Sequence, residues 1–361
     1  MARAPPGAPR PPVAPGRRGT RQRPRPARRV PPALSPGEPD RNPARKPPSA
    51  TLQAFRAGAF AARHLPEPLV RAVAGGAAVA VARTPPVPGR IGRVARRRAM
   101  VARHLERVYG RRLGRLEKIR LVDEVFVSYA RYWAESFRLP GLTAEEVAAG
   151  IHYDHFDRIE AGLEAGKGVI LALPHLGGWE WAGTDLVVRG LKVNVVVEAL
   201  EPPDLFEWFV SFREQLGMKV IPVGPGAASQ CARALAANEV LCLLCDRTVA
   251  GTAGVEVEFF GERTELPGGP ATLALRTGAT LLTAGVYFDL GPRRHLGVVG
   301  PALDLARSGR LREDVSAGTR QVTAELEELI RRAPTQWHML QPNWPSDPGW
   351  SRPARTAAPP A

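Results

Sequence analysis

The stretch GVILALPHLGGWEWAGTD, residues 168–185, carries in succession the patterns of a strand, a tight turn and a helix. Its apolar run, Val169–Leu173, has the length and composition of a buried strand. The proline that follows ends the strand, because proline cannot donate a hydrogen bond to a sheet ladder. Two glycines then allow a tight turn, and residues 179–189 are predicted to form a helix. A strand followed by a helix is the building unit of an α/β fold.

One titratable side chain, His175, comes directly after this strand and its proline. Open α/β sheets bind their ligands at the carboxyl ends of strands, so this position alone makes His175 a candidate functional residue. Glu180 follows five residues later and can meet it, because His175 lies in the turn and Glu180 in the first helical turn. A carboxylate that orients an imidazole strengthens it as a base. The alternative is a histidine bonded to a backbone carbonyl, beside a glutamate that favours the start of a helix.

Strand-like and helix-like runs alternate from residue 168 onward. The strand-like runs are Val169–Leu173, Val193–Val197, Lys219–Pro222, 240–245, 255–260, Thr280–Phe288 and 296–299. The helix-like runs are 179–189, 204–217, 227–238, Gly269–Thr277 and 310–332. This alternation predicts an α/β fold with a central mixed sheet, partly parallel and flanked by helices. The last strands lie closer together in the sequence, which favours antiparallel pairing between them.

Residues 51–150 carry a helical pattern. Two short helices are predicted within 51–82, a basic helix over 91–109 and a longer helix over 113–139. Arginines separate the apolar residues of 51–82, which suits a membrane-associating element at a lipid interface; ordinary packing onto the core is the alternative. The most apolar run, residues 72–82, has 11 residues, whereas a bilayer span needs about 20.

The formal net charge of +15 is unevenly distributed. Residues 1–50 contain 12 Arg or Lys and two acidic residues, so the rest of the chain carries only +5. They also contain 15 of the 37 prolines, and we predict a disordered basic tail, either simply solvated or weakly attracted to anionic lipid. Residues 346–361 are predicted to form a second disordered tail. One domain is expected over 51–345, with a helical part (51–150) and an α/β part (151–345).

The cysteines do not suggest a disulfide framework or a metal site. There are three of them, an odd and sparse count that favours a reducing compartment. Cys242 and Cys245 form a C-x-x-C pattern, but it lies inside a strand-like run, and a zinc site would need a second pair. The first 50 residues lack the apolar core of a secretory signal. The sequence shows no cluster of metal-ligand residues, so we expect no metal.

Further polar residues follow the predicted strands. Glu198 follows Val193–Val197, and Asp246 and Arg247 follow the run 240–245. Arg213 lies in the helix that precedes the next strand. Each residue has an ordinary alternative, such as an ion pair on a surface helix for Arg213 or a turn cap for Asp246. Because carboxyl ends of parallel strands share one edge of a sheet, the group together with His175 favours a functional site.

The block HLGGWEWAG at 175–183 resembles the H-x4-D/E motif of the lysophospholipid acyltransferase superfamily. Within it the chain resembles the bacterial lipid A (late) acyltransferases, and more closely their phosphatidylinositol mannoside acyltransferase branch. Further blocks carry the resemblance: ARYWAESFRLP (130–140), FREQLGMKVIP (212–222), GVEVEFFGE (254–262), LPGGPATLALRTGA (266–279) and WHMLQPNW (337–344). It covers residues 51–345 and implies a glycerolipid acyltransferase-like fold.

The resemblance implies transfer of a fatty acyl chain from acyl-CoA to a sugar hydroxyl of a mannosylated phosphatidylinositol, at the cytoplasmic face of the cell membrane. It implies that His175 is the general base and Glu180 its paired acid, a position that is often Asp in this subfamily. It also implies that Glu198, Arg213 and Asp246 line the substrate pocket. Thr248 departs from the acidic residue often found at its position.

The expected chemistry needs a positioned base, because a sugar hydroxyl is a poor nucleophile at neutral pH. Backbone N–H groups around Gly177 and Gly178 are candidate donors to the developing oxyanion. Arg213 and Arg247 could hold a phosphate of the lipid or of CoA. The chain has no nucleophile-elbow pattern, so we expect direct transfer, with acyl-CoA as donor substrate and no cofactor.

Three other functions remain open at this stage. A lipid A-type acyltransferase would use another glycolipid acceptor. A hydrolase would use the same His and Glu pair on water. A basic nucleic-acid-binding protein would use the tail and the helix 91–109, although no nucleic-acid-binding motif is present and nucleic acid is not the expected partner.

Overall fold

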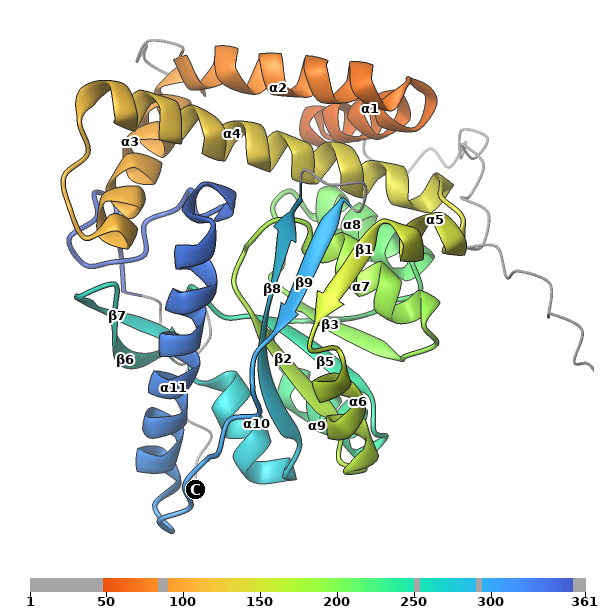
Figure 1. The fold of residues 1–361 in the computed structure, drawn as a ribbon, viewed down its shortest axis with the longest axis vertical. Coiled ribbons are helices and arrows are strands. Elements are labelled where there is room, and N and C mark those ends of the chain that lie inside the picture. Colours follow the sequence, from red (N-terminus) through yellow and green to blue (C-terminus); the bar gives the residue numbers. More distant parts are fainter. Residues whose placement is uncertain (1–47, 84–89, 250–253, 290–293, 353–361) are drawn as a thin grey trace, which may run out of the picture.

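The computed structural model of the chain describes residues 48–83, 90–249, 254–289 and 294–352 (Figure 1). Its central sheet has the strand order β1-β9-β8-β2-β5-β3-β4. These strands are β1 (Ile151–Asp154), β2 (Val169–Leu173), β3 (Val193–Val197), β4 (Lys219–Pro222), β5 (Val240–Leu244), β8 (Thr280–Phe288) and β9 (His295–Val299). Neighbouring strands run parallel, except for the antiparallel pair β8 and β9. The predicted mixed α/β sheet is confirmed, including the antiparallel pairing of the last strands.

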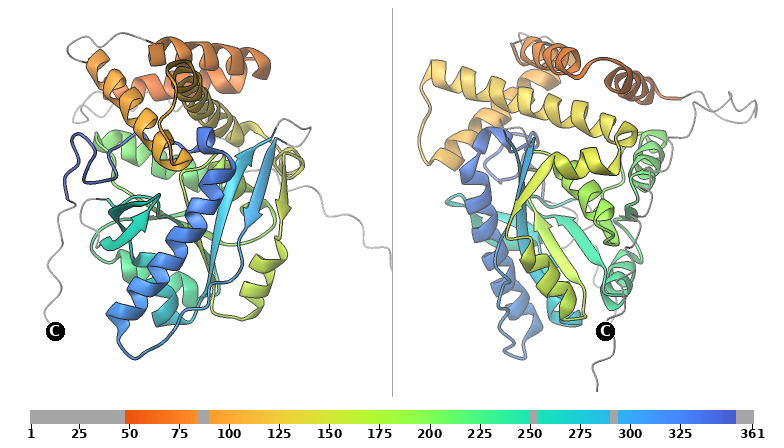
Figure 2. Two further views of the ribbon diagram at one scale, coloured as in Figure 1. Left: turned by 60° about the vertical axis from the view of Figure 1, so that its left-hand side comes forward. Right: turned by 45° about the vertical axis from the view of Figure 1, so that its right-hand side comes forward.

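Strand β2 is buried on both faces, as its uninterrupted apolar sequence predicts. Successive side chains of a strand point to opposite faces. Val169 and Leu171 therefore pack in one apolar cluster, and Ile170 and Ala172 in another. The first face is covered by α6 (Asp157–Glu164), α7 (Trp179–Val188) and α8 (Pro203–Gln215), and the second by α9 (Ala227–Ala236), α10 (Gly269–Thr277) and α11 (Leu311–Arg332). Figure 2 shows α11 running along the sheet.

The helical part forms a layer across one end of the sheet. It consists of α1 (Ala50–His64), α2 (Glu67–Arg83), α3 (Arg90–Tyr109), α4 (Arg115–Arg138), the 3-10 turn η1 (Leu139–Gly141) and α5 (Ala144–Ala149). The two predicted short helices, the basic helix and the longer helix are all confirmed. Figure 1 shows α4 crossing the end of the sheet toward which β8 points. Among the described residues, no helix combines the length and the apolar character needed to span a bilayer.

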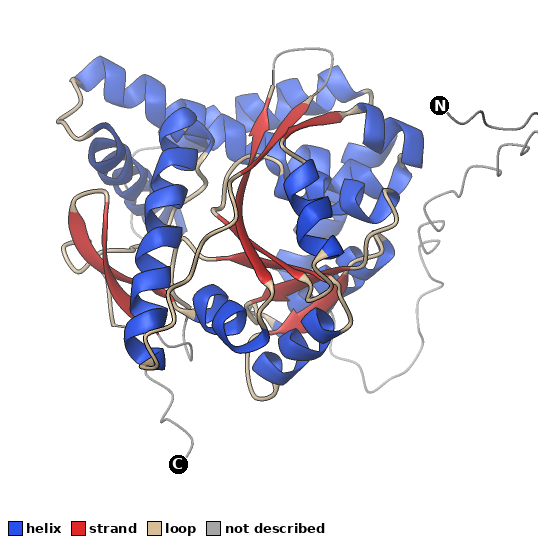
Figure 3. Ribbon diagram, turned by 60° about the horizontal axis from the view of Figure 1, so that its bottom comes forward, coloured by secondary structure: helices blue, strands red, loops and turns tan. Residues whose placement is uncertain are grey.

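Strands β1 and β7 (Glu262–Pro267) differ from the prediction, whereas β6 (Gly254–Phe259) matches the predicted run 255–260. The sequence pattern did not indicate β1 or β7, because both are short and mix polar with apolar residues. The antiparallel β6–β7 pair forms a sheet of its own, which lies beside α11 (Figure 3). At the C-terminal end, the 3-10 turn η2 (Pro334–Gln336) follows α11.

The packed part of the chain continues beyond the predicted boundary at residue 345. Asp347 is buried and accepts hydrogen bonds from the backbone N–H groups of Asn343 and Trp344. At the other end, Ser49 caps α1 and hydrogen-bonds to Asp204 of α8. The remainder of the two predicted tails, residues 1–47 and 353–361, lies outside the described residues.

Candidate active site

The turn after β2 is held against two neighbouring segments. Gly177 has a φ of +58°, and a Cβ at this position would overlap with the carbonyl oxygen of Val286. Only glycine meets both conditions without strain. The Gly177 N–H donates to the carbonyl of Gln336 (3.0 Å), and the His338 N–H donates to the carbonyl of His175 (2.8 Å). The residues that follow α11 therefore pair with the turn and fix the backbone of His175.

His175 pairs with Asp246 across the edge of the sheet. Its Nδ1 lies 2.6 Å from Asp246 Oδ1, and its backbone N–H donates to Asp246 Oδ2 over 2.8 Å. Asp246 is fully buried, whereas the His175 side chain is 21% exposed. With Asp246 ionised, Nδ1 carries the imidazole proton. Nε2, on the other side of the ring, is then the atom that can accept a proton from a substrate.

The environment of Asp246 favours its ionised form. Burial alone would raise the pKa of Asp246. The charge of His175 and the hydrogen bonds from His175 and Trp337 outweigh burial and hold the pKa of Asp246 below its ordinary value. The carboxylate therefore stays charged beside the imidazole, as an orienting group for a general base must.

Glu180 lies elsewhere than the predicted contact with His175. It is buried, and its Oε1 accepts hydrogen bonds from Arg213 Nε (3.0 Å) and Nη2 (2.5 Å), and from the Tyr132 hydroxyl (3.2 Å). The reason is geometric: α7 begins at Trp179, so the helix directs Glu180 toward α8 and α4, while His175 precedes the turn. Among the described residues, Asp246 is the carboxylate hydrogen-bonded to the His175 imidazole.

Sheet register explains why Asp246 takes this place. In the parallel pair β2–β5, Leu173 is the partner of Leu244, and His175 and Asp246 each lie two residues further on. Parallel neighbours leave the sheet at the same edge, so the two side chains emerge together. Both residues were predicted to lie at this edge, but the family resemblance implied that Asp246 lines the substrate pocket and that Glu180 pairs with the histidine.

Arg247 and Glu198 form a second pair at the same edge. Arg247 Nη2 donates to Glu198 Oε2 over 2.5 Å, and the two side chains are 21% and 36% exposed. Both residues follow strands, β5 and β3 respectively. They are more accessible to solvent than Glu180 and Arg213, whose side chains are 4% and 16% exposed.

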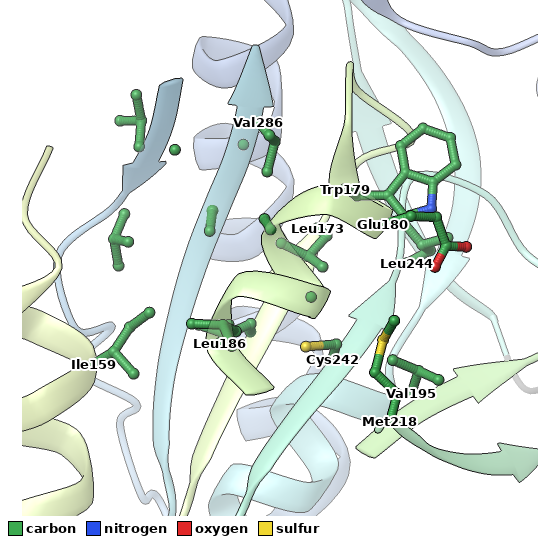
Figure 4. Close-up of a pocket in the computed structure, with 18 of the residues that line it drawn as sticks. Ile159, Leu173, Trp179, Glu180, Leu186, Val195, Met218, Cys242, Leu244 and Val286 are labelled. Atoms are coloured by element: carbon green, nitrogen blue, oxygen red, sulfur yellow. The ribbon is translucent and has the colours of Figure 1, made fainter. Parts of the chain in front are cut away.

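An apolar cavity lies between α7 and the sheet (Figure 4). Its lining includes Leu173, Leu186, Val195, Met218, Cys242 and Val286. Glu180 and Arg213 are among the few polar residues that contribute to its wall. Figure 4 shows Trp179 and Glu180 at one end of the cavity and Ile159 toward the other. Trp179 also contacts the His175 ring edge-on, at a centroid distance of 5.6 Å, so the cavity begins next to the histidine.

A second histidine, His338, lies behind the site. It is 4% exposed, its Nε2 lies 2.8 Å from the Ser128 hydroxyl, and its ring packs against Tyr129, Tyr132 and Trp179. Burial, with a smaller contribution from the charge of His175, lowers the pKa of His338 to about 3. His338 is therefore neutral at physiological pH. The block 337–344 carries part of the family resemblance, but no role was predicted for its residues.

One of the two predicted oxyanion donors needs a correction. The Gly177 N–H is already engaged by Gln336 and cannot serve. The N–H groups of Trp179 and Glu180, at the N-terminus of α7, have no hydrogen-bond acceptor among the described residues. The Gly178 N–H likewise has no acceptor among the described residues, so only the Gly177 part of the prediction is wrong and the N-terminus of α7 retains donors. Within the described ranges, no group of three or more His, Cys, Asp or Glu side chains is arranged to hold a metal.

The α/β fold, the H-x4-E turn and the cavity beside it are consistent with the protein family that the sequence matches. The bacterial lipid A biosynthesis acyltransferase family matches residues 42–346, and the chain belongs to this family. It is therefore an acyltransferase by family.

Among its relatives are phosphatidylinositol mannoside acyltransferases. Two from Mycobacterium tuberculosis are 42% and 41% identical over 235 and 234 residues, which cover 63% of this chain and 71% of each relative. One from Mycolicibacterium smegmatis is 38% identical over 241 residues, 65% of this chain and 76% of that protein. The predicted family is confirmed.

Proposed function

We propose that this protein transfers a fatty acyl chain from acyl-CoA to a sugar hydroxyl of a phosphatidylinositol mannoside. The observation that carries the proposal is the His175–Asp246 pair, whose imidazole contacts Trp179 in the wall of an apolar cavity beside the turn of the family motif. The names of the mycobacterial relatives support the choice of acceptor.

In this mechanism His175 acts as the general base. Its Nε2 takes the hydroxyl proton while the sugar oxygen attacks the thioester carbonyl, and Asp246 stabilises the imidazolium that forms. The tetrahedral intermediate then collapses and its C–S bond breaks. The leaving thiolate takes the proton from Nε2, so the step returns a neutral imidazole and releases CoA.

The remaining groups stabilise charge and hold the substrates. The free N–H groups of Trp179 and Glu180 are aimed outward from the N-terminus of α7, where helix geometry favours an oxyanion. The apolar cavity suits a fatty acyl chain. The partly exposed pair of Glu198 and Arg247 suits the polar parts of the substrates: the carboxylate can accept from sugar hydroxyls and the guanidinium can bind a phosphate.

In this scheme Glu180 supports the site indirectly. It holds Arg213 and the Tyr132 hydroxyl, and Tyr132 stacks on Trp179 at a centroid distance of 4.0 Å. Trp179 in turn contacts His175. A substitution at Glu180 therefore affects the position of the His175 imidazole indirectly, through the packing of the Tyr132 and Trp179 rings.

We further propose that the protein binds peripherally to the cytoplasmic face of the membrane through α1 and α2. Phe60 and Val73 are 64% and 61% exposed, and Leu69 is also exposed. Exposed Arg56 and Arg71 lie among them, and this combination suits an interface of acyl chains and anionic headgroups. Co-sedimentation with phosphatidylglycerol vesicles tests this, and the double variant Phe60→Ser/Val73→Ser should bind less than wild type. The control is Leu311→Ser, which should bind like wild type: Leu311 is exposed and is the first residue of α11, a helix that begins at the opposite end of the molecule from α1 and α2 (Figure 1).

The reaction is tested with radiolabelled palmitoyl-CoA and purified phosphatidylinositol mannosides, with wild type beside His175→Ala. Label should appear in the glycolipid with wild type only. Labelled free fatty acid and CoA without labelled glycolipid would indicate hydrolysis instead. Transfer to another glycolipid but not to the mannoside would support acyl transfer with a different acceptor. Transfer by the His175→Ala variant would refute the role of His175 as general base.

A further inference from the structure

The segment that follows α11 contacts both members of the His175–Asp246 pair. Gln336 and His338 hydrogen-bond to the turn that contains His175, and Leu176 and Trp337 form an isolated antiparallel bridge between them. The same segment reaches Asp246 twice. Trp337 Nε1 donates to Asp246 Oδ2 over 2.7 Å, and Asn343 Nδ2 donates to the Asp246 carbonyl over 2.8 Å.

We propose that Trp337 is a positioning residue for catalysis, whose indole N–H holds the Asp246 carboxylate in the orientation that directs Oδ1 to His175. This inference rests on the function proposed above. It concerns a residue about 90 positions away from Asp246 in the chain, which the proposed chemistry does not itself use.

The arrangement of donors around Asp246 supports this role. Oδ2 accepts two N–H groups, from the His175 backbone and from Trp337, whereas Oδ1 accepts the imidazole Nδ1. Two donors on one oxygen fix the plane of the carboxylate. The second oxygen then points at the imidazole without rotational freedom. Without Trp337, a single backbone N–H would hold Oδ2.

The indole itself is held by packing. Trp337 is 3% exposed and lies among the rings of Phe259 (6.0 Å between centroids), Phe260 (5.8 Å) and His104 (5.7 Å). A side chain so enclosed keeps one rotamer, so its N–H is pre-organised toward Asp246 rather than recruited during the reaction.

A matched control lies seven residues away in the same aromatic cluster. Trp344 is fully buried, and its ring is 6.4 Å from that of Trp337 between centroids. Its indole N–H donates over 3.1 Å to the carbonyl of Phe259 and does not contact Asp246. Replacement by phenylalanine therefore removes one ring and one hydrogen bond at either position. Only the replacement at Trp337 removes a hydrogen bond to the Asp246 carboxylate.

The test compares Trp337→Phe, Trp344→Phe and His175→Ala in the acyl-transfer assay, with kcat and KM measured across pH. Trp337→Phe should lower kcat by about 10- to 100-fold with little change in KM, the loss expected for one hydrogen bond to a charged group. The acid limb of its kcat profile should move to higher pH, because a carboxylate with fewer donors holds a proton more tightly. Trp344→Phe should keep the wild-type kcat and pH profile.

A second substitution guards against misfolding. Benzothienylalanine, in which a sulfur atom replaces the indole N–H, can be incorporated at position 337; it keeps the fused-ring shape but cannot donate a hydrogen bond. It should therefore reproduce the loss in kcat and the shift of the acid limb to higher pH that are expected for Trp337→Phe. Wild-type values for this protein would overturn the proposal, as would equal losses in the Trp337→Phe and Trp344→Phe variants. If wild type transfers the label and His175→Ala does not, the proposed reaction and its base stand whatever Trp337→Phe does. If wild type transfers no label to the glycolipid, the proposed reaction fails, and if His175→Ala still transfers it, the assignment of the base fails.

Discussion

Two buried carboxylates lie on either side of the turn between β2 and α7, and their partners differ in kind. Asp246 meets an imidazole, which can gain and lose a proton near neutral pH. Glu180 meets a guanidinium, which cannot. Burial alone would lower the pKa of Arg213. The charge of Glu180 and the contact with Tyr132 outweigh burial and hold this pKa above its ordinary value. The first pair is suited to proton transfer and the second to holding structure.

The strongest test of this difference is Asp246→Asn. The amide keeps the size of the side chain but presents no charge to His175 and permits the wrong imidazole tautomer. By analogy with the same change in a Ser-His-Asp site, kcat should fall by about 10⁴-fold. Steady-state acyl transfer measures this. Asp185→Asn is the control, because Asp185 is equally buried but pairs with Arg189, and its kcat should be near that of wild type.

Glu180→Gln should instead act mainly on stability. It leaves the Arg213 charge buried without a counter-charge, which costs about 3–5 kcal/mol of unfolding free energy. Urea unfolding measures the loss. The double variant Glu180→Gln/Arg213→Met should recover much of it, because it removes the unpaired charge. A Glu180→Gln protein as stable as wild type, with the activity loss of Asp246→Asn, would reverse the assignment of the two carboxylates.

Acid should weaken the folded protein through Asp246 and His338. Because the pKa of Asp246 is lowered in the folded protein, it contributes stability that is present above its unfolded pKa, about 4. That contribution is lost as pH falls through the lower, folded pKa.

His338 affects stability over a higher pH range. Its pKa is about 3 in the folded protein and about 6.5 in the unfolded chain, so between these values the unfolding free energy falls by about 1.4 kcal/mol for each unit by which the pH is lowered. Urea unfolding from pH 7 to pH 3 should therefore show a shallower slope for His338→Asn than for wild type. An identical slope would mean that His338 is charged in the folded protein.

The smallest expected effect comes from Tyr132→Phe. This change removes one hydroxyl from Glu180 and leaves Arg213 in place, so the unfolding free energy should fall by about 1 kcal/mol. The Phe ring still stacks on Trp179, and kcat should stay within about threefold of wild type. A much larger drop in kcat, measured at unchanged stability, would place the hydroxyl in contact with the substrate.

Much of the fold was predictable from local pattern. The β2 run is apolar throughout because both of its faces are buried, and the order of strands and helices from residue 168 onward identified the α/β class. Strands β1 and β7 were missed because four to six residues of mixed polarity carry too little periodicity to distinguish a strand from a loop.

The sequence by itself also determined that His175, Asp246, Glu198 and Arg247 share one edge of the sheet, because each follows a strand and parallel strands end together. Which carboxylate pairs with His175 was decided only by tertiary structure. The parallel register of β2 and β5 brings Asp246 to the imidazole, and the start of α7 directs Glu180 to Arg213. Spacing along the chain measures neither register nor the direction of a side chain. For the same reason Trp337, which reaches Asp246 from the segment after α11, could be recognised only in the folded protein.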